Sequence, residues 1–136
     1  MRILFKLLRR LFWLALALVL AAGGLLAFQG YRMYRQALDG QSLEAALSAV
    51  RSAPGYTPID QLPELYLDAV VAVEDHRFEQ HSGIDPIAIL RAAVHDLRTR
   101  SLDQGGSTIT QQVAKNLFFT QEKQFARKIA EVFMAF

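Results

Sequence analysis

An uncharged apolar stretch near the N-terminus constrains the fold of this chain more than any other feature. Residues 11–28 read LFWLALALVLAAGGLLAF, which is 18 residues without a charged side chain. As a helix, this stretch is roughly 27 Å long, and the hydrocarbon core of a bilayer is about 30 Å thick. We therefore expect one transmembrane helix, with the longer remainder of the chain outside the bilayer.

The charges beside this stretch predict its orientation. Basic residues are in excess on its N-terminal side, with Arg2, Lys6, Arg9 and Arg10 against Arg32 and Arg35. An excess of Lys and Arg marks the cytoplasmic flank of a transmembrane helix. We therefore expect a single-pass protein of the cytoplasmic membrane, with residues 37–136 on the outer side, periplasmic or extracellular. A cleaved signal peptide is the alternative, but its apolar region is usually only about 7–15 residues long.

Charge and cysteine content exclude further classes of protein. Residues 1–36 hold six of the 15 Lys and Arg residues and no acidic residue, so residues 37–136 carry a net charge of −4. A nucleic-acid-binding domain needs a basic surface, so no nucleic-acid partner is expected. Because the chain has no cysteine, it has neither a disulfide framework nor a thiolate metal site.

The remainder divides into a connector and a mainly helical domain. Behind the anchor at 1–36, residues 37–59 contain Pro54, Gly55 and Pro58, which predicts a connector with one short helix. Residues 60–136 show helical periodicity and no strand alternation, which predicts four helices. The expected helix starts are Asp60, Asp85 with Pro86, Ser107 or Thr108, and Thr120 with Glu122. The first of these helices is expected to end at or just after residues 74–75.

Apolar residues at helical spacing predict which faces of these helices are buried. The expected inward-facing residues are Leu62, Leu65, Ala69 and Val73, then Ile87, Leu90, Val94 and Leu97, and finally Phe125, Ile129, Val132 and Phe136. The last face continues to the terminal residue without a glycine cap or a proline. We therefore expect a domain truncated at its C-terminus, as the N-terminal portion of a longer unit.

The first stretch that could carry chemistry is EDHRFEQHSGID at residues 74–85. Adjacent carboxylates on a helix point about 100° apart, so one of Glu74 and Asp75 is expected to react while the other holds structure. The alternative is an ordinary solvated loop. The histidines His76 and His81 lack the i, i+4 spacing of a helical zinc site, which favours a structural or hydrogen-bonding role for them.

The second stretch is QGGSTITQQVAKN at residues 104–116. Two glycines precede a helix N-terminus, a geometry that suits a phosphate or diphosphate. The stretch is not a P-loop, because no Gly-Lys-Ser/Thr follows the glycines. The alternative is an ordinary turn with a helix cap.

The third stretch is ARKIAEVFMAF at residues 126–136. Arg127 and Lys128 lie four and three residues before Glu131, so all three share one helix face. The alternative is an exposed cluster of helical ion pairs.

Together, in this order and behind an N-terminal anchor, the three stretches resemble the peptidoglycan glycosyltransferases of family 51. This family includes monofunctional transglycosylases and the N-terminal domains of class A penicillin-binding proteins. EDHRFEQHSG at 74–83 looks like the family's E-D-x-x-F-x-x-H-x-G motif, GGSTITQQ at 105–112 like G-G-S-T-I-x-Q-Q, and RKIAE at 127–131 like R-K-x-x-E. The resemblance covers about residues 60–136 and implies a lysozyme-like helical domain with a small membrane-contacting lobe.

The resemblance also implies an activity and residue roles. The implied reaction polymerises lipid II into glycan strands, by inverting transfer to a sugar 4-hydroxyl with undecaprenyl diphosphate as the leaving group. Glu74 is similar to the family's catalytic base and Glu131 to its second essential acidic residue. The implied substrate-binding residues are Asp75, Arg77, Phe78, His81, Gly106, Ser107, Thr108, Gln111, Gln112, Lys115, Asn116, Arg127 and Lys128. The diphosphate needs charge neutralisation, from basic side chains, helix amides or a divalent cation such as Mg²⁺ or Mn²⁺, for which the sequence assigns no ligands.

The implied partners are lipid II, the growing glycan strand, the bilayer and other cell-wall synthesis proteins. Two other functions stay open at this point. A membrane-anchored lytic glycosidase would also use paired carboxylates, but it leaves the cationic groups and Gly-Gly-Ser-Thr unexplained. A non-catalytic scaffold that binds the cell wall or a partner would not need Glu74.

Overall fold

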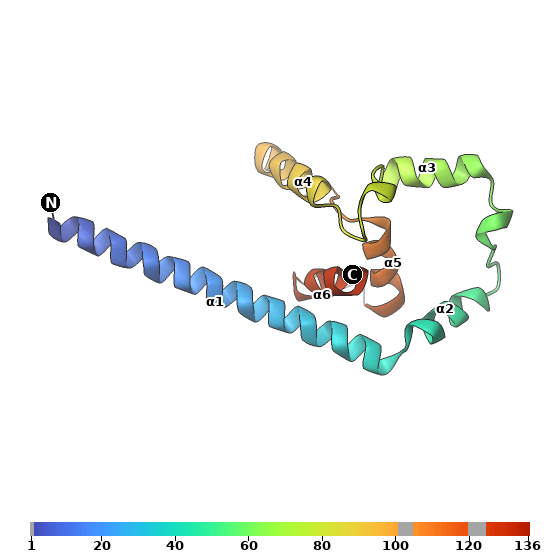
Figure 1. Cartoon of the computed structure of the whole chain (residues 1–136), viewed down its shortest axis with the longest axis horizontal. Helices are drawn as coiled ribbons and strands as arrows, with labels where there is room; N and C mark the ends of the chain where they lie inside the picture. The colour runs from blue at the N-terminus through green and yellow to red at the C-terminus, as the bar shows by residue number, and fades with distance from the viewer. Residues whose placement is uncertain (1, 101–104, 120–124) are drawn as a thin grey trace.

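The structure, a computed structural model, describes residues 2–100, 105–119 and 125–136, and these residues contain helices and no strand. In chain order the α-helices are α1 (Arg2–Gly40), α2 (Leu43–Arg51), α3 (Glu64–Glu74), α4 (Pro86–Thr99), α5 (Ile109–Phe118) and α6 (Phe125–Ala135), as Figure 1 shows. Short 3₁₀ helices occupy Ile59–Gln61 and Phe78–Gln80. The predicted fold class, a long apolar N-terminal helix followed by a mainly helical domain, is confirmed.

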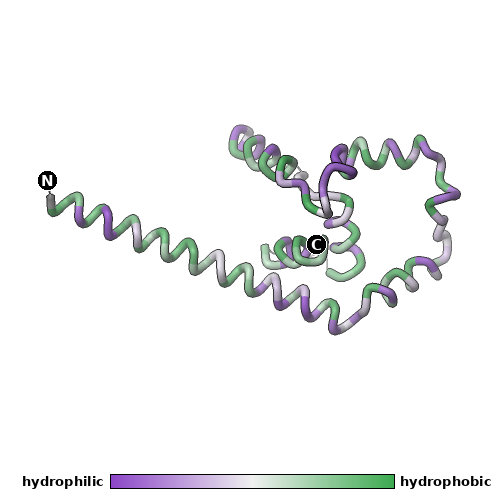
Figure 2. Tube along the Cα trace, in the orientation of Figure 1, coloured by the Kyte–Doolittle hydropathy of each residue, from purple (hydrophilic) through white to green (hydrophobic). Residues whose placement is uncertain are grey.

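The helix α1 is a rod whose N-terminal half projects beyond the rest of the molecule (Figure 1). By length and composition, Ile3–Gly40 is the one described helix that could cross a membrane. Its apolar side chains are exposed. In Figure 2 the Cα tube of this helix is green, the colour of hydrophobic residues, over much of its length. The helix continues through Gly40, so the predicted boundary at residue 36 lies inside it. The connector contains the expected short helix, α2, whose first turn is capped by the Ser42 hydroxyl.

The prediction that Asp60 caps the next helix is wrong. Asp60 lies in the 3₁₀ helix Ile59–Gln61, and α3 begins only at Glu64, after Pro63. The cause is Leu62, which precedes the proline and is extended (φ −85°, ψ 141°). A proline disfavours the α conformation for the residue before it, so no helix runs through this point. The predicted end of this helix at Glu74 is confirmed.

The caps of the next two helices are confirmed. The Asp85 carboxylate accepts a hydrogen bond from the Ile87 amide at 2.9 Å, with Pro86 in the first turn of α4. For α5 the cap is Thr108 rather than Ser107. Its hydroxyl accepts from the Gln111 amide while the Gln111 side chain accepts from the Thr108 amide, which is a capping box. The predicted start at Thr120 with Glu122 lies outside the described residues.

The predicted inward faces of α3 and α4 are wrong. Leu65 is 80% exposed, Val73 81% and Leu97 82%, and Ile87, Leu90 and Val94 are exposed as well. In Figure 1, α3 and α4 stand away from the other helices. Sequence periodicity identifies an apolar face, but it does not show what covers that face.

The packed centre of the fold lies where α6 meets α1 on one side and α5 on the other. Its buried apolar side chains are small, namely Ala114, Ala126 and Ala130. The predicted inner face of α6 is therefore wrong at its ends, since Phe125 is 84% and Phe136 87% exposed. At Gly30 the helix α1 comes so close to α6 that a Cβ on Gly30 would lie 2.6 Å from the Ile129 side chain.

Candidate active site

The two adjacent carboxylates of the first motif separate at the end of α3. Glu74 is the last residue of the helix and is exposed. Asp75 leaves the helix (φ −158°, ψ 68°) and is buried. This divergence gives Asp75 an internal position and leaves Glu74 facing solvent.

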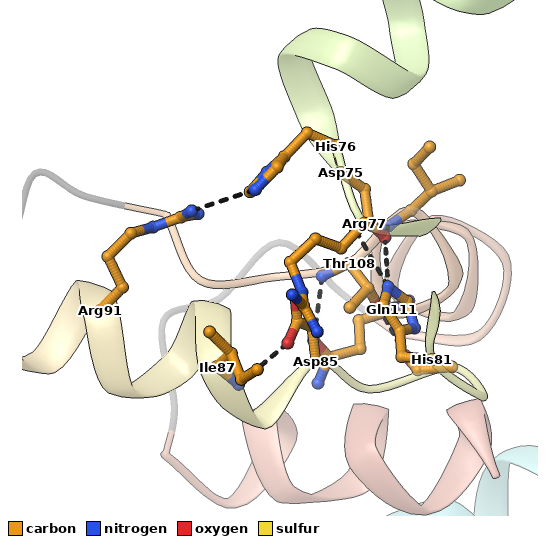
Figure 3. A network of polar contacts seen from close by, with 11 residues as sticks. Asp75, His76, Arg77, His81, Asp85, Ile87, Arg91, Thr108 and Gln111 are labelled. Carbon is orange, nitrogen blue, oxygen red and sulfur yellow. Dashed lines mark hydrogen bonds and ion pairs between the residues drawn. The ribbon is translucent and has the colours of Figure 1, made fainter. Parts of the chain in front are cut away.

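Asp75 joins the first motif to the second, as Figure 3 shows. One oxygen of its carboxylate accepts a hydrogen bond from the backbone amide of Ile109, at the start of α5, at 3.1 Å. The same carboxylate lies 2.9 Å from Nε2 of His81. Because an ionised carboxylate only accepts hydrogen bonds, Nε2 carries the proton, and Nδ1 of His81 is buried without a partner among the described residues. The structural interpretation of His81 thus agrees with the geometry.

A second buried carboxylate, that of Asp85, lies in the same network (Figure 3). Nε of Arg77 donates a hydrogen bond to it at 3.0 Å. Burial raises the pKa of Asp85, but hydrogen bonds from the amides of Ala88 and Ile87 and the Arg77 guanidinium outweigh this, so the pKa lies below its usual value. The Arg77 guanidinium therefore forms an ion pair with the Asp85 carboxylate.

Gly83 and Thr108 bring all three motifs together. The Thr108 hydroxyl donates a hydrogen bond to the Gly83 carbonyl oxygen at 2.6 Å. Gly83 has a φ of +89°, and a Cβ there would collide with the carbonyl oxygen of Ala135 in α6. Only glycine suits both the conformation and the close approach.

The third motif supplies a buried carboxylate between two cations. Glu131 is 1% exposed, and its oxygens pair with Nη1 of Arg127 and, at 3.1 Å, with Nζ of Lys128. Nζ of Lys128 also donates a hydrogen bond to the Ser107 hydroxyl, in the second motif. The Lys128 side chain keeps 45% of its surface exposed, so its ammonium group is accessible to a ligand.

Glu74 is also held by the second motif. Nε2 of Gln112 donates a hydrogen bond to a Glu74 carboxylate oxygen at 2.7 Å. The exposed carboxylate therefore has one defined partner on α5. The accessible carboxylate of Glu74 and the accessible ammonium group of Lys128 are each hydrogen-bonded to a residue near the start of α5, Gln112 and Ser107.

The other predicted site residues differ in their surroundings. Thr108 and Gln111 are buried and form the cap of α5, so substrate contact by these side chains stays a prediction. Lys115 is half-buried and forms no ion pair with any residue that the structure describes. Asn116 is exposed. The Phe78 ring stands edge-on to the His81 ring, with 6.2 Å between centroids.

Gly106 is a predicted site residue that packs against α4. A Cβ there would lie 3.2 Å from Cβ of Ala92 and from Cα of Ile89. Sequence reasoning missed two contacts that assemble this network, Asp75 with His81 and Arg77 with Asp85. The density of charge in residues 74–85 was the available signal.

The carboxylates of this network do not fit a protein-held divalent cation. Asp75, His81 and Asp85 have the right atom types, within 4.8 Å of one another. Every carboxylate oxygen of the two aspartates already accepts a hydrogen bond, and the Arg77 guanidinium adds a positive charge beside Asp85. The arrangement fits a hydrogen-bonded network, and we assign it no metal.

Comparison with known proteins agrees with these motifs. The transglycosylase family matches residues 39–136. A penicillin-binding protein 1A of Aquifex aeolicus is 54% identical over 80 residues, which are 59% of this chain and 11% of the relative. A putative transglycosylase of Cupriavidus necator is 46% identical over 91 residues, 67% of this chain and 39% of the relative.

A penicillin-binding protein 1A of Vibrio cholerae is 47% identical over 77 residues, which are 57% of this chain and 9% of the relative. The chain thus spans well under half the length of these relatives. The family match nevertheless includes all three motifs and the network that joins them. The chain belongs to the transglycosylases, the peptidoglycan glycosyltransferases of family 51.

Proposed function

We propose that the protein polymerises lipid II into peptidoglycan glycan strands at the outer surface of the cytoplasmic membrane. The observation that carries this proposal is that an accessible carboxylate and an accessible ammonium group are each hydrogen-bonded to a residue near the start of α5. Glu74 is held there by Gln112, and Lys128 by Ser107 and Glu131. A proton acceptor and a cation are what transfer from a sugar diphosphate requires.

Glu74 acts as the general base. A sugar hydroxyl is a poor nucleophile at neutral pH, so the Glu74 carboxylate takes its proton as the oxygen attacks. The new bond joins the acceptor 4-oxygen to the anomeric carbon of the donor. The bond from that carbon to the diphosphate oxygen breaks with inversion, and undecaprenyl diphosphate departs with the electron pair. Because the diphosphate leaves as an anion, no acid is needed to protonate it.

Cations neutralise the departing diphosphate. Lys128 presents an ammonium group beside Ser107, and the start of α5 adds the positive end of its helix dipole. Lys115 lies on the same helix, and we assign it a share in this role. Glu131 keeps Arg127 and Lys128 in place. A divalent cation at the diphosphate, such as Mg²⁺ or Mn²⁺, stays a prediction.

The anchor fits a substrate that is itself fixed in the membrane. Residues Ile3–Gly40 are long and apolar enough to span a bilayer. With the basic flank in the cytoplasm, the three motifs lie on the outer side. The growing glycan strand and the bilayer are then the immediate partners, and other cell-wall synthesis proteins are further ones.

The geometry disfavours a lytic glycosidase. Glycoside hydrolysis needs two carboxyl groups that face the substrate, one to protonate the leaving oxygen and one to act on water or carbon. Glu131, the second acidic residue that the family resemblance implies, is buried and paired with two cations, so it does not face a substrate beside Glu74. A scaffold without activity would not need the Gln112 contact that orients Glu74.

Incubation of the purified protein with labelled lipid-linked disaccharide pentapeptide tests the proposal. We expect long glycan that a muramidase digests to disaccharides. Short soluble fragments, released from pre-formed glycan, would indicate a lytic enzyme instead. If the full protein in liposomes forms no product of either kind, the result would favour the non-catalytic scaffold.

A further inference from the structure

Gly30 is the point at which the anchor helix meets the helix that carries Glu131. Among residues 3–40 of α1, Gly30 is the one that is buried. A Cβ at this position would lie 2.6 Å from both Cβ and Cγ2 of Ile129, and 3.0 Å from the carbonyl oxygen of Ala126. Both neighbours belong to α6, so the two helices approach more closely here than any residue with a side chain would permit.

The contact is built on both sides of this glycine. In α6, Ala126 and Ala130 are buried, and their small side chains allow α6 to lie close to α1. One turn further along, the Phe133 ring packs against the rings of Tyr31 and Tyr34, with centroids 5.5 and 6.0 Å apart. Figure 1 shows α6 lying beside the C-terminal half of α1. These contacts fix α6 both along and around the anchor.

The position of Gly30 in the chain gives this contact a further consequence. Gly30 follows the last residue of the uncharged stretch, Phe28, by two positions, or about 3 Å along an α-helix. The helix α1 is continuous through both residues. The contact therefore places α6 at the level where the apolar part of the anchor ends.

We propose that Gly30 is a positioning residue that fixes the height and tilt of α6, and with it Glu131 and Lys128, above the bilayer surface. This inference rests on the proposed function, because it matters for a substrate whose diphosphate is itself held at the membrane surface by a lipid. A Cβ at Gly30 would force α6 away from α1 by about 1 Å. Misplacement on this scale, remote from the reacting atoms, can lower a rate by about a hundredfold.

The anchor itself offers matched controls. Gly23 and Gly24 lie in the same helix, and a Cβ at either would meet nothing within 4 Å. Gly30→Leu should therefore be compared with Gly24→Leu, and Gly30→Ala with Gly24→Ala. Each pair changes helix propensity equally, so a difference within a pair reports the contact with α6.

The first readout needs no substrate. The chain has no cysteine, so a single spin label can be placed at the first residue of α6 by Phe125→Cys, or just after its last residue by Phe136→Cys, both at exposed positions. Its depth is measured against paramagnetic headgroup lipids in liposomes. We expect Gly30→Leu to change the label depth at one or both ends, and Gly24→Leu to leave both unchanged. Equal depths in the two variants would overturn the proposal.

The second readout separates positioning from general loss of structure. We expect Gly30→Leu to lower turnover of undecaprenyl-linked substrate in liposomes by about 10- to 100-fold relative to Gly24→Leu. The loss should be smaller on a short-chain, water-soluble analogue, which is not held at a fixed height. An equal loss on both substrates would contradict the proposal, because misfolding affects both alike.

A compensating change covers the case in which leucine is not tolerated. Ile129→Gly removes both Cβ and Cγ2, the two atoms nearest to the added Cβ, and should restore part of the depth and turnover lost in Gly30→Ala. No restoration in the double variant would count against the contact. If the parent protein forms no glycan, the proposed function fails, while the label depths still decide the role of Gly30.

Discussion

Where α1, α5 and α6 pack together, the buried residues are alanines and hydrogen-bonded polar groups, whereas α3 and α4 expose leucine, isoleucine and valine. The largest fully buried side chains are those of Gln111, Glu131, Thr108 and Asp85. All four lie in the three stretches 74–85, 104–116 and 126–136. The comparison teaches that polar contacts, more than apolar burial, hold the motifs in one arrangement, and that the outlying helices contribute little to it.

The largest expected effect on turnover comes from a substitution at Glu74, where α3 meets the packed centre. Glu74 ends α3 and contacts Gln112 in the packed centre. Glu74→Gln keeps the shape but cannot take a proton, so we expect turnover to fall by about 10²- to 10⁴-fold with lipid-substrate binding largely intact. Initial rates and a binding measurement on the same protein check this. Near-normal turnover by a folded Glu74→Gln protein would remove Glu74 as the base.

Loss of an accessible cation is expected to have the next largest effect. Lys128→Ala and Lys115→Ala should each lower turnover by about 10- to 100-fold, because a cation is most useful where negative charge develops. Arg98→Ala, an exposed change in α4, is the matched control and should have no effect. Rates measured across substrate concentrations distinguish slower turnover from weaker binding. Equal rates in all three variants would contradict the assignment.

Removal of a buried carboxylate should affect stability instead of chemistry. Asp75→Ala leaves Nε2 of His81 and the Ile109 amide without an acceptor, at a cost of about 3 kcal/mol in the free energy of unfolding. Asp68→Ala, at an exposed position of α3, should change it little. Denaturant unfolding of the solubilised protein measures both. Similar free energies of unfolding for Asp75→Ala and Asp68→Ala would show that the Asp75 network does not stabilise the arrangement of the motifs.

Low pH should lower the stability of the folded protein by protonating Asp85. Its pKa lies below the usual value of 3.8, so the folded protein prefers the ionised form. The stabilisation is complete above that value and is lost as the pH falls through the lower, folded-state pKa. We expect thermal stability to decline below about pH 4, and to decline less in Asp85→Asn. Parallel declines in the two proteins would exclude Asp85 as the cause.

The smallest effect is expected on the outlying helices. Leu97→Ser, at an exposed position of α4, should change stability by less than about 0.5 kcal/mol. Ala130→Leu, at a fully buried position of α6, should lower it by about 1–3 kcal/mol through overpacking. Thermal unfolding of the two variants tests this contrast. A larger loss in Leu97→Ser would show that α4 has a buried face after all.

Local signals in the sequence predicted the parts of the fold that depend on neighbouring residues. Asp85 with Pro86, Thr108 with Gln111, and the end of α3 at Glu74 follow from capping and backbone rules. The failure at Asp60 had a local cause as well, since Pro63 restricts Leu62. Such signals require no knowledge of the rest of the molecule.

Long-range contacts could not be predicted in the same way. The pairing of Asp75 with the Ile109 amide joins residues 34 positions apart, and nothing in either segment specifies the other. The buried residues of α6 are Ala126, Ala130 and Glu131, where the helix contacts α1 and α5, and the apolar periodicity of α6 alone does not identify these neighbours. The motifs supplied the candidate residues of the site, while their separation into buried and accessible groups came only from the fold.

Counting both products of one reaction tests the central claim most directly. Labelled lipid-linked disaccharide pentapeptide is supplied in liposomes, and the released undecaprenyl diphosphate is measured together with the disaccharide incorporated into glycan. The account predicts that the two products increase in step as long strands form, and that Glu74→Gln lowers both by about 10²- to 10⁴-fold. Release of diphosphate without incorporation, or undiminished glycan formation by Glu74→Gln, would contradict it.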